Sequence, residues 1–465
     1  MKKAIFILIA LITVSAVMAE QNPRDMKFEP IAFDPPMPER FVTDNGIVVF
    51  FLENHELPVV TCNIRFKGGN VYDPPAKIGL GAVTASMMRT GGAGVRTPDQ
   101  VDIDLDYVAA SIRSNSNNHS FALSLRCLKK DAELGFEILS DIIISPKFDS
   151  AKFELEKSMT KDRILRRDDS PRQLTYRVLL QNLYGNHPYG QYTSLNSIDN
   201  ITRDDAIDLQ NKYYVPDNCI MAIAGDMTLD EVKGFIAKYF GEWKGTVSSF
   251  DAIPMATDDY KPGVYHAEKD INQANIYLGN ILMTDENPDR FAFEVMNFAL
   301  GGGDFSSRIT KQVRTTEGLA YSTGTWPNFR QYNGYLIGWC ITGSETLSKA
   351  LTMILDIIEE VKNNGITEEE LIIAKESIIN SYIFDFDTPS ELVNAYAGNE
   401  LRGFPLDKMK TDLQHYQSVT LEQCWETAQK YLNPKKLVIA VTGKKELFDQ
   451  PLDIFGEVTE VPVGN

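Results

Sequence analysis

The chain has 465 residues, of which 43% are hydrophobic and 24% are charged, as in a large soluble globular protein. At about 150 residues per domain, this length predicts roughly three domains. The formal net charge of −18 argues against nucleic acid and anionic membrane surfaces as partners. The five cysteines are scattered and form no C-x-x-C pair, so their spacing assigns no disulfide.

Residues 1–19 have the pattern of a secretory signal peptide. Two lysines precede an apolar run over 4–16, and Val17-Met18-Ala19 places small residues at a cleavage site after Ala19. An N-terminal membrane anchor is the alternative, but the run is short for a span. Removing the two lysines changes the net charge from −18 to −20. We therefore expect a periplasmic or secreted protein that has no membrane partner once the signal is removed.

Beyond a Pro-rich and charged arm over 20–39, the first half has strand patterns followed by helical patterns. Apolar and polar residues alternate over Val60–Phe66 and again over Phe121–Cys127, which predicts two half-buried strands. Helical spacing predicts three helices, over Gly79–Met88, Phe136–Ile144 and Phe153–Leu165. Strands followed by helices indicate an α+β fold.

The second half repeats the first at a constant spacing. Six pairs of similar residues are separated by 218 positions: Phe153/Leu371, Lys157/Lys375, Thr202/Thr420, Lys212/Lys430, Pro216/Pro434 and Gly225/Gly443. The same offset of 218 positions in separate segments of the chain is hard to obtain by chance. The repeat predicts two similar tandem α+β domains, 40–245 and 263–460, each a mainly antiparallel sheet with helices packed on it. Residues 246–262, with their Ser, Asp and Pro content, are the predicted linker.

The stretch Ser306–Tyr321 holds a guanidinium and a phenol around one turn. Arg314 and Tyr321 are seven positions apart, with a predicted helix end at Gly318 between them. Both groups donate hydrogen bonds and neither is a usual zinc ligand. They could hold a peptide carbonyl without supplying the means to cleave it. The alternative is structural, with Arg314 paired to Glu317 and Tyr321 buried.

Several motifs together resemble the pitrilysin and insulinase metallopeptidases, including the mitochondrial processing peptidases. The resemblance covers nearly all of the chain after the signal. Its motifs are Lys77-Ile-Gly-Leu-Gly-Ala82, Tyr184-Gly-Asn-His-Pro-Tyr-Gly190, Tyr214-Val-Pro-Asp-Asn218, Ala224-Gly-Asp226, and Leu300-Gly-Gly-Gly-Asp-Phe-Ser-Ser-Arg308 continuing to Arg314 and Tyr321. This resemblance implies a half-clamshell of two similar domains, and two such halves enclose a chamber in which peptides are cut.

Active members of that family carry the zinc motif H-x-x-E-H on the first helix and a distant Glu as third ligand. Placing this sequence on the pattern puts Ala82 and Ser86 in the two His positions, and Ala85 in the Glu position. Arg163 falls at the third ligand, whether counted from Ser86 or from the Glu156-Lys157 pair. No pair of histidines has i, i+4 spacing, and His187 is interpreted as a loop or chamber-wall residue. We therefore expect no metal in this chain and a zinc ion in a partner subunit.

The resemblance also implies a role for the Arg/Tyr pair. In two-subunit relatives the zinc-free subunit supplies such a pair, and here Arg314 and Tyr321 are present while the zinc motif is not. The hypothesis is a non-catalytic, peptide-binding subunit of a periplasmic zinc endopeptidase, inactive alone and paired with a homologous zinc-bearing chain. The alternatives are a non-enzymatic peptide-binding or scaffold protein, and an enzyme with a different metal site.

Overall fold

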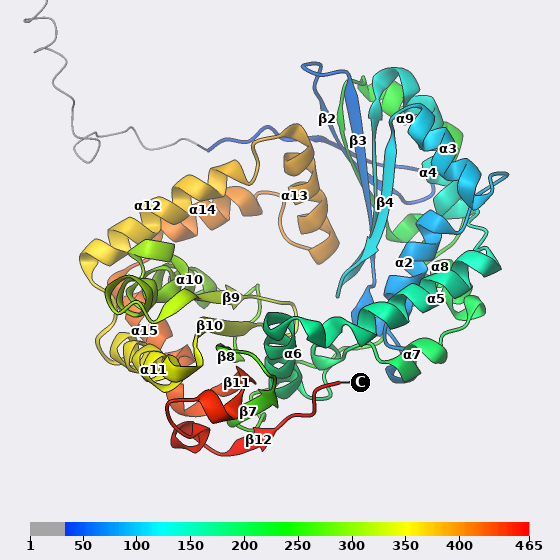
Figure 1. Cartoon of the computed structure of the whole chain (residues 1–465). Coiled ribbons are helices and arrows are strands. Elements are labelled where there is room, and N and C mark those ends of the chain that lie inside the picture. Colours follow the sequence, from blue (N-terminus) through cyan, green and yellow to red (C-terminus); the bar gives the residue numbers. More distant parts are fainter. Residues whose placement is uncertain (1–32, 465) are drawn as a thin grey trace, which may run out of the picture. The chain divides into compact units, whose positions relative to one another are not determined.

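Two six-stranded sheets, each with mixed strand directions, form the framework of residues 33–464, the part of the chain that the computed structural model describes (Figure 1). The predicted signal peptide, 1–19, lies outside these residues. The first sheet has the order β1-β2-β6-β3-β5-β4, with strands β1 Glu39–Val42, β2 Val48–Glu53, β3 Val59–Lys67, β4 Ser111–Ser116, β5 Ser120–Leu128 and β6 Cys219–Gly225. The second has the order β12-β7-β11-β8-β10-β9, with strands β7 Gly263–Glu268, β8 Gln273–Ile281, β9 Ala320–Asn328, β10 Tyr335–Gly343, β11 Val438–Gly443 and β12 Val458–Glu460.

Most strand pairs are antiparallel, as the sequence pattern predicted. The alternating apolar residues of β3 and β5 are buried, and the two strands pair antiparallel with Cys62 opposite Leu125. Only β2–β6 is parallel among the pairs of the first sheet. In the second sheet, β7 runs parallel to both β11 and β12. The fold is therefore two similar α+β units with mainly antiparallel sheets.

Helices pack on both sheets. Those before residue 262 are α2 Leu80–Thr90, α3 Pro98–Tyr107, α4 Ala132–Ile144, α5 Ser150–Leu165, α6 Pro171–Tyr184, α7 Leu195–Asp199, α8 Arg203–Tyr213 and α9 Leu229–Phe240. Those after it are α10 Asp289–Asn297, α11 Leu347–Asn364, α12 Glu368–Phe384, α13 Pro389–Arg402, α14 Lys408–Ser418 and α15 Leu421–Tyr431. None of the helices in the described range is long and apolar enough to cross a bilayer.

The 218-residue repeat reappears in the structure. The first residues of α5, α6 and α8 are each separated by 218 positions from those of α12, α13 and α15. Local contacts repeat at the same offset. The Lys157 ammonium donates to the carbonyls of Asp199 and Ile201, and the Lys375 ammonium donates to those of Gln417 and Val419. The two halves thus share a local design as well as a strand order.

Helices α6 and α13 are exchanged between the halves. Helix α6, from the first half, packs on β7, β8 and β11 of the second sheet (Figure 1). Its buried face, which includes Leu174 and Leu179, joins a cluster with Tyr277 and Ala440 of the second sheet. Helix α13, from the second half, packs on β2, β3 and β6 of the first sheet, where the Tyr396 ring stacks on Phe50. Equivalent helices therefore cover the opposite half's sheet.

Candidate functional site

The positions that correspond to the family's zinc site lie on two helices that contact each other, α2 and α5. Ala82 is exposed on α2, Ala85 is buried, and Ser86 is half-buried. The Ser86 hydroxyl donates to a Glu156 carboxylate oxygen at 2.8 Å. The Arg163 guanidinium donates to the other Glu156 oxygen at 2.6 Å. The structure thus brings Ser86 and Arg163 together on one carboxylate.

This arrangement does not fit zinc. Methyl groups at Ala82 and Ala85 donate no electron pair, and a guanidinium at Arg163 repels a cation. Glu156 is the one carboxylate in this group, and it is already bonded to Ser86 and Arg163. Among residues 33–464, no three His, Cys, Asp or Glu side chains are arranged to hold a metal ion. No hydrolytic step can be derived from these side chains.

Arg314 and Tyr321 flank a turn in the second half. Arg314 lies in a π-helical segment, Thr310–Thr316, that ends where the Leu319 amide donates to the Val313 carbonyl at 2.9 Å. Gly318 has φ +64°, the left-handed conformation expected of a helix end, and β9 begins at Ala320. The turn therefore places the guanidinium at the end of a helical segment and the phenol at the start of a strand.

Both side chains are available to a ligand. The Tyr321 side chain is 79% exposed, and the Arg314 guanidinium lies 4.8 Å from the ring centroid of the exposed Phe305. Within the described chain, neither has a side-chain hydrogen bond or an ion pair. Glu317 pairs instead with Lys349 at 2.7 Å. The structural alternative for this pair, an ion pair with Glu317 and a buried tyrosine, is therefore wrong.

The loop containing His187 is held by its own hydrogen bonds. One ring nitrogen of His187 accepts from the Tyr189 amide at 3.1 Å, and the other lies 2.9 Å from the Pro254 carbonyl. Burial lowers the pKa of His187. With both nitrogens in use, the imidazole serves the loop rather than a metal.

The Gly301-Gly302-Gly303 run packs closely against neighbouring atoms. The helix before it, α10, continues as a π-helical segment, Phe298–Gly302. A side chain at Gly301 would meet the Thr325 hydroxyl at 2.5 Å. This run is a tight contact between helix and strand.

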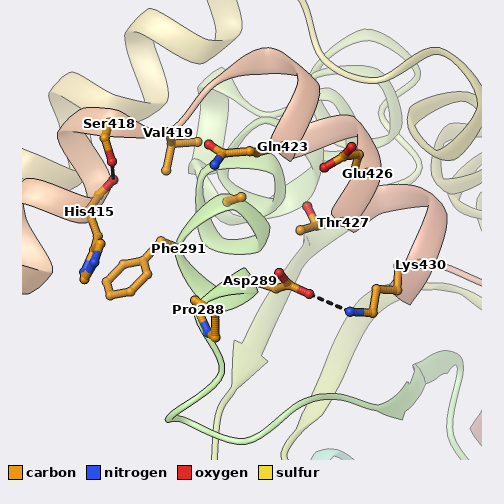
Figure 2. A pocket seen from close by; sticks show the side chains of 11 residues that line it. Pro288, Asp289, Phe291, His415, Ser418, Val419, Gln423, Glu426, Thr427 and Lys430 are labelled. Carbon is orange, nitrogen blue, oxygen red and sulfur yellow. Dashed lines mark hydrogen bonds and ion pairs between the residues drawn. The ribbon is translucent and has the colours of Figure 1, made fainter.

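Two cavities differ in the charge of their walls. One, of about 550 Å³, lies among α10, α14 and α15 and includes the carboxylates of Asp289 and Glu426 (Figure 2). The Asp289 carboxylate is paired with Lys430 at 2.7 Å. The other, of about 490 Å³, includes Tyr321 and has no carboxylate in its wall. Only the second cavity contains a residue predicted to act on a peptide.

Sequence patterns did not identify three residues near the Arg/Tyr pair. Phe305 lies under the Arg314 guanidinium, and Arg172 and Asn275 line the cavity beside Tyr321. Arg172 belongs to the exchanged helix α6, so its proximity to Tyr321 depends on a packing that no local pattern encodes. The signal in the sequence is that Asn275 stands between apolar residues, Ala274 and Ile276, although β8 also contains Asn280.

The fold defines a metallopeptidase-like protein, and the positions that correspond to the family's zinc ligands hold no zinc donor. Two family models match consecutive parts of the chain: "Insulinase (Peptidase family M16)" over residues 48–195 and "Peptidase M16 inactive domain" over residues 200–378. The chain belongs to the insulinase family of metallopeptidases, peptidase family M16, and is a non-catalytic type that lacks H-x-x-E-H.

Two relatives match most of the chain, and a solved structure has the same fold. The chain is 24% identical over 403 residues to the "Non-peptidase homolog YmxG" of Helicobacter pylori, covering 86% of this chain and 92% of that protein. It is 25% identical over 352 residues to an uncharacterized zinc protease of Mycobacterium leprae, covering 75% and 79% respectively. A crystal structure of a peptidase M16 inactive domain from Pseudomonas fluorescens has a TM-score of 0.81 at 24% identity, covering 89% and 99%.

Proposed function

We propose that this chain is the substrate-binding, non-catalytic subunit of a two-chain zinc endopeptidase. The observation that carries the proposal is a contrast between two sites, the positions of the zinc ligands and the Arg/Tyr pair. The zinc positions Ala82 and Arg163 hold groups that cannot bind a metal, whereas Arg314 and Tyr321 offer free donors. A homologous zinc-bearing chain would supply the metal and the attacking water. The signal-like leader supports a periplasmic or secreted location for the pair.

In this proposal Arg314 and Tyr321 act on the peptide bond to be cut in the partner's site. A guanidinium and a phenol can both donate to the peptide carbonyl, and donate more strongly once that oxygen becomes negative. Phe305, under the guanidinium, restricts where Arg314 can point. The chain contributes orientation and charge stabilisation and leaves proton transfer to the partner.

The test first isolates a zinc-bearing relative by its co-purification with the full chain and then mixes the two chains. Arg314→Ala should lower kcat of the mixture by about 10²–10³, the usual loss for one oxyanion donor. Tyr321→Phe, which removes only the hydroxyl, should lower it in the same range. Lys311→Ala is the matched control, because Lys311 is an exposed cation on the same helical segment. If the Arg314 and Tyr321 variants cleave as fast as the control, the proposal is wrong.

A second candidate is a non-enzymatic peptide-binding or scaffold protein. The missing metal donors support it, as does the name of the Helicobacter pylori relative, which calls that protein a non-peptidase homolog. This candidate predicts that the chain binds peptides or an unrelated complex, and that no mixture with a zinc-bearing relative gains activity. The same kinetic experiment therefore separates the two candidates.

A further inference from the structure

The cavity beside Tyr321 combines residues from both halves of the chain. Its wall includes the start of α6, with Ser170 and Arg172. It also includes the starts of two strands of the second sheet, with Asn272, Gln273 and Asn275 at β8 and Tyr321 at β9. Its volume is about 490 Å³, enough for one or two amino-acid side chains. None of its lining residues is acidic, although the chain has 64 acidic residues against 46 basic ones.

Arg172 provides a cation with free donors. Its Nε donates to the Tyr277 hydroxyl at 2.9 Å, which fixes the plane of the guanidinium. In the described part of the chain, no carboxylate lies within ion-pair distance of it. The two terminal nitrogens are therefore available for two parallel hydrogen bonds, the arrangement that an arginine makes with a carboxylate.

Asn275 provides an independent sign of a ligand. The residue is only 5% exposed and lines the cavity. Among residues 33–464, nothing forms a hydrogen bond with its amide. The amide opens onto the cavity, where it can donate a hydrogen bond to a ligand oxygen. A ligand group in the cavity would satisfy it.

We propose that this cavity binds a carboxylate of the peptide held by Tyr321, through Arg172 and Asn275. This inference rests on the proposed function, because it takes the ligand beside Tyr321 to be a peptide. The first turn of α6 adds a positive helix end to the same wall. The carboxylate is that of an Asp or Glu side chain or of the peptide's C-terminus, and the chemistry of the cavity is the same for both.

The test measures binding of labelled peptides to the purified full chain by fluorescence anisotropy. Four decapeptides share one sequence of Ala, Ser and Leu. Two contain a single Glu and two contain Gln in its place, each with a free or an amidated C-terminus. We expect at least one carboxylate-bearing peptide to bind about tenfold more tightly than the peptide with neither carboxylate. Loss on Glu→Gln exchange identifies a side chain, and loss on amidation identifies the C-terminus.

Variants of the protein assign this preference to the cavity. Arg172→Gln and Asn275→Leu should each reduce the tenfold difference severalfold. Tyr277→Phe removes the hydrogen bond to Arg172 but keeps the charge, so it should retain most of the difference. Arg126→Gln removes an exposed positive charge outside the cavity and should leave the difference unchanged.

The possible failures are distinguishable. Equal binding of all four peptides, or an equal effect of Arg126→Gln and Arg172→Gln, would overturn the carboxylate site and leave the proposed function standing. Absence of binding for every peptide would overturn both. If the carboxylate preference holds but Arg314→Ala does not slow the partner's cleavage, only the catalytic part of the proposed function fails.

Discussion

Truncating a leucine on an exchanged helix should destabilise both halves at once. Leu392 on α13 is 3% exposed, and Leu174, at the equivalent position of α6, is fully buried. Each lies on a helix that covers the opposite half's sheet. A buried Leu→Ala change costs about 2–5 kcal/mol, from lost burial and from the cavity left behind. Because a domain of this kind has only about 5–15 kcal/mol of stability in total, the loss should be plain in a urea titration.

The four tryptophans allow each half to be followed separately. Trp243 is the one tryptophan before residue 263, and Trp326, Trp339 and Trp425 follow it. A chain with Phe at the last three positions reports the first half, and Trp243→Phe reports the second. We expect both reporters to show one common midpoint, which Leu392→Ala lowers in both. Leu392→Met, a volume-conserving control, should cost less than about 1.5 kcal/mol. Two separate midpoints, with Leu392→Ala moving only one of them, would refute the coupling.

Two further predictions concern pH and helix caps. Burial and the positive charges of Arg402 and Arg330 lower the pKa of His119 to about 4. The unfolded chain binds this proton below about pH 6.5 and the folded chain does not, so stability is lost as the pH falls from about 6.5 to about 4. Urea titrations give the free energy of unfolding at pH 7 and at about pH 5. His119→Asn should make the loss between these two pH values smaller by roughly 2 kcal/mol. An unchanged loss would contradict the lowered pKa of His119. Thr420→Ala removes a capping box with Gln423 at the start of α15 and should cost about 1 kcal/mol of unfolding free energy, whereas a loss below about 0.3 kcal/mol would argue against the cap.

Local patterns in the sequence predicted much of the fold. Alternation over Val60–Phe66 and Phe121–Cys127 predicted β3 and β5, and the 218-residue offset predicted two similar units. The alternation involves residues near one another in the chain, and the offset is a direct repetition of similar residues. Both are therefore visible in the sequence. The exchange of α6 and α13 was not predicted, because a buried helix face does not specify which sheet covers it.

The same limit applies to the candidate site. The absence of zinc donors at Ala82 and Arg163 is visible in the residue types, and so is the Arg/Tyr pair. The sequence did not show that Ser86 and Arg163 both donate hydrogen bonds to Glu156, because these bonds depend on the packing of α2 against α5. Arg172 and Tyr321 are 149 positions apart, and only the exchange of α6 places both on one cavity.

We propose that this chain binds a peptide and carries no zinc of its own. Metal analysis of the purified full chain, after gel filtration in micromolar zinc, tests it most directly. Ala82, Ala85, Ser86 and Arg163 lead us to expect well under one zinc per chain and no peptide cleavage by the chain alone. One tightly bound zinc per chain, with cleavage that a chelator abolishes, would contradict the account.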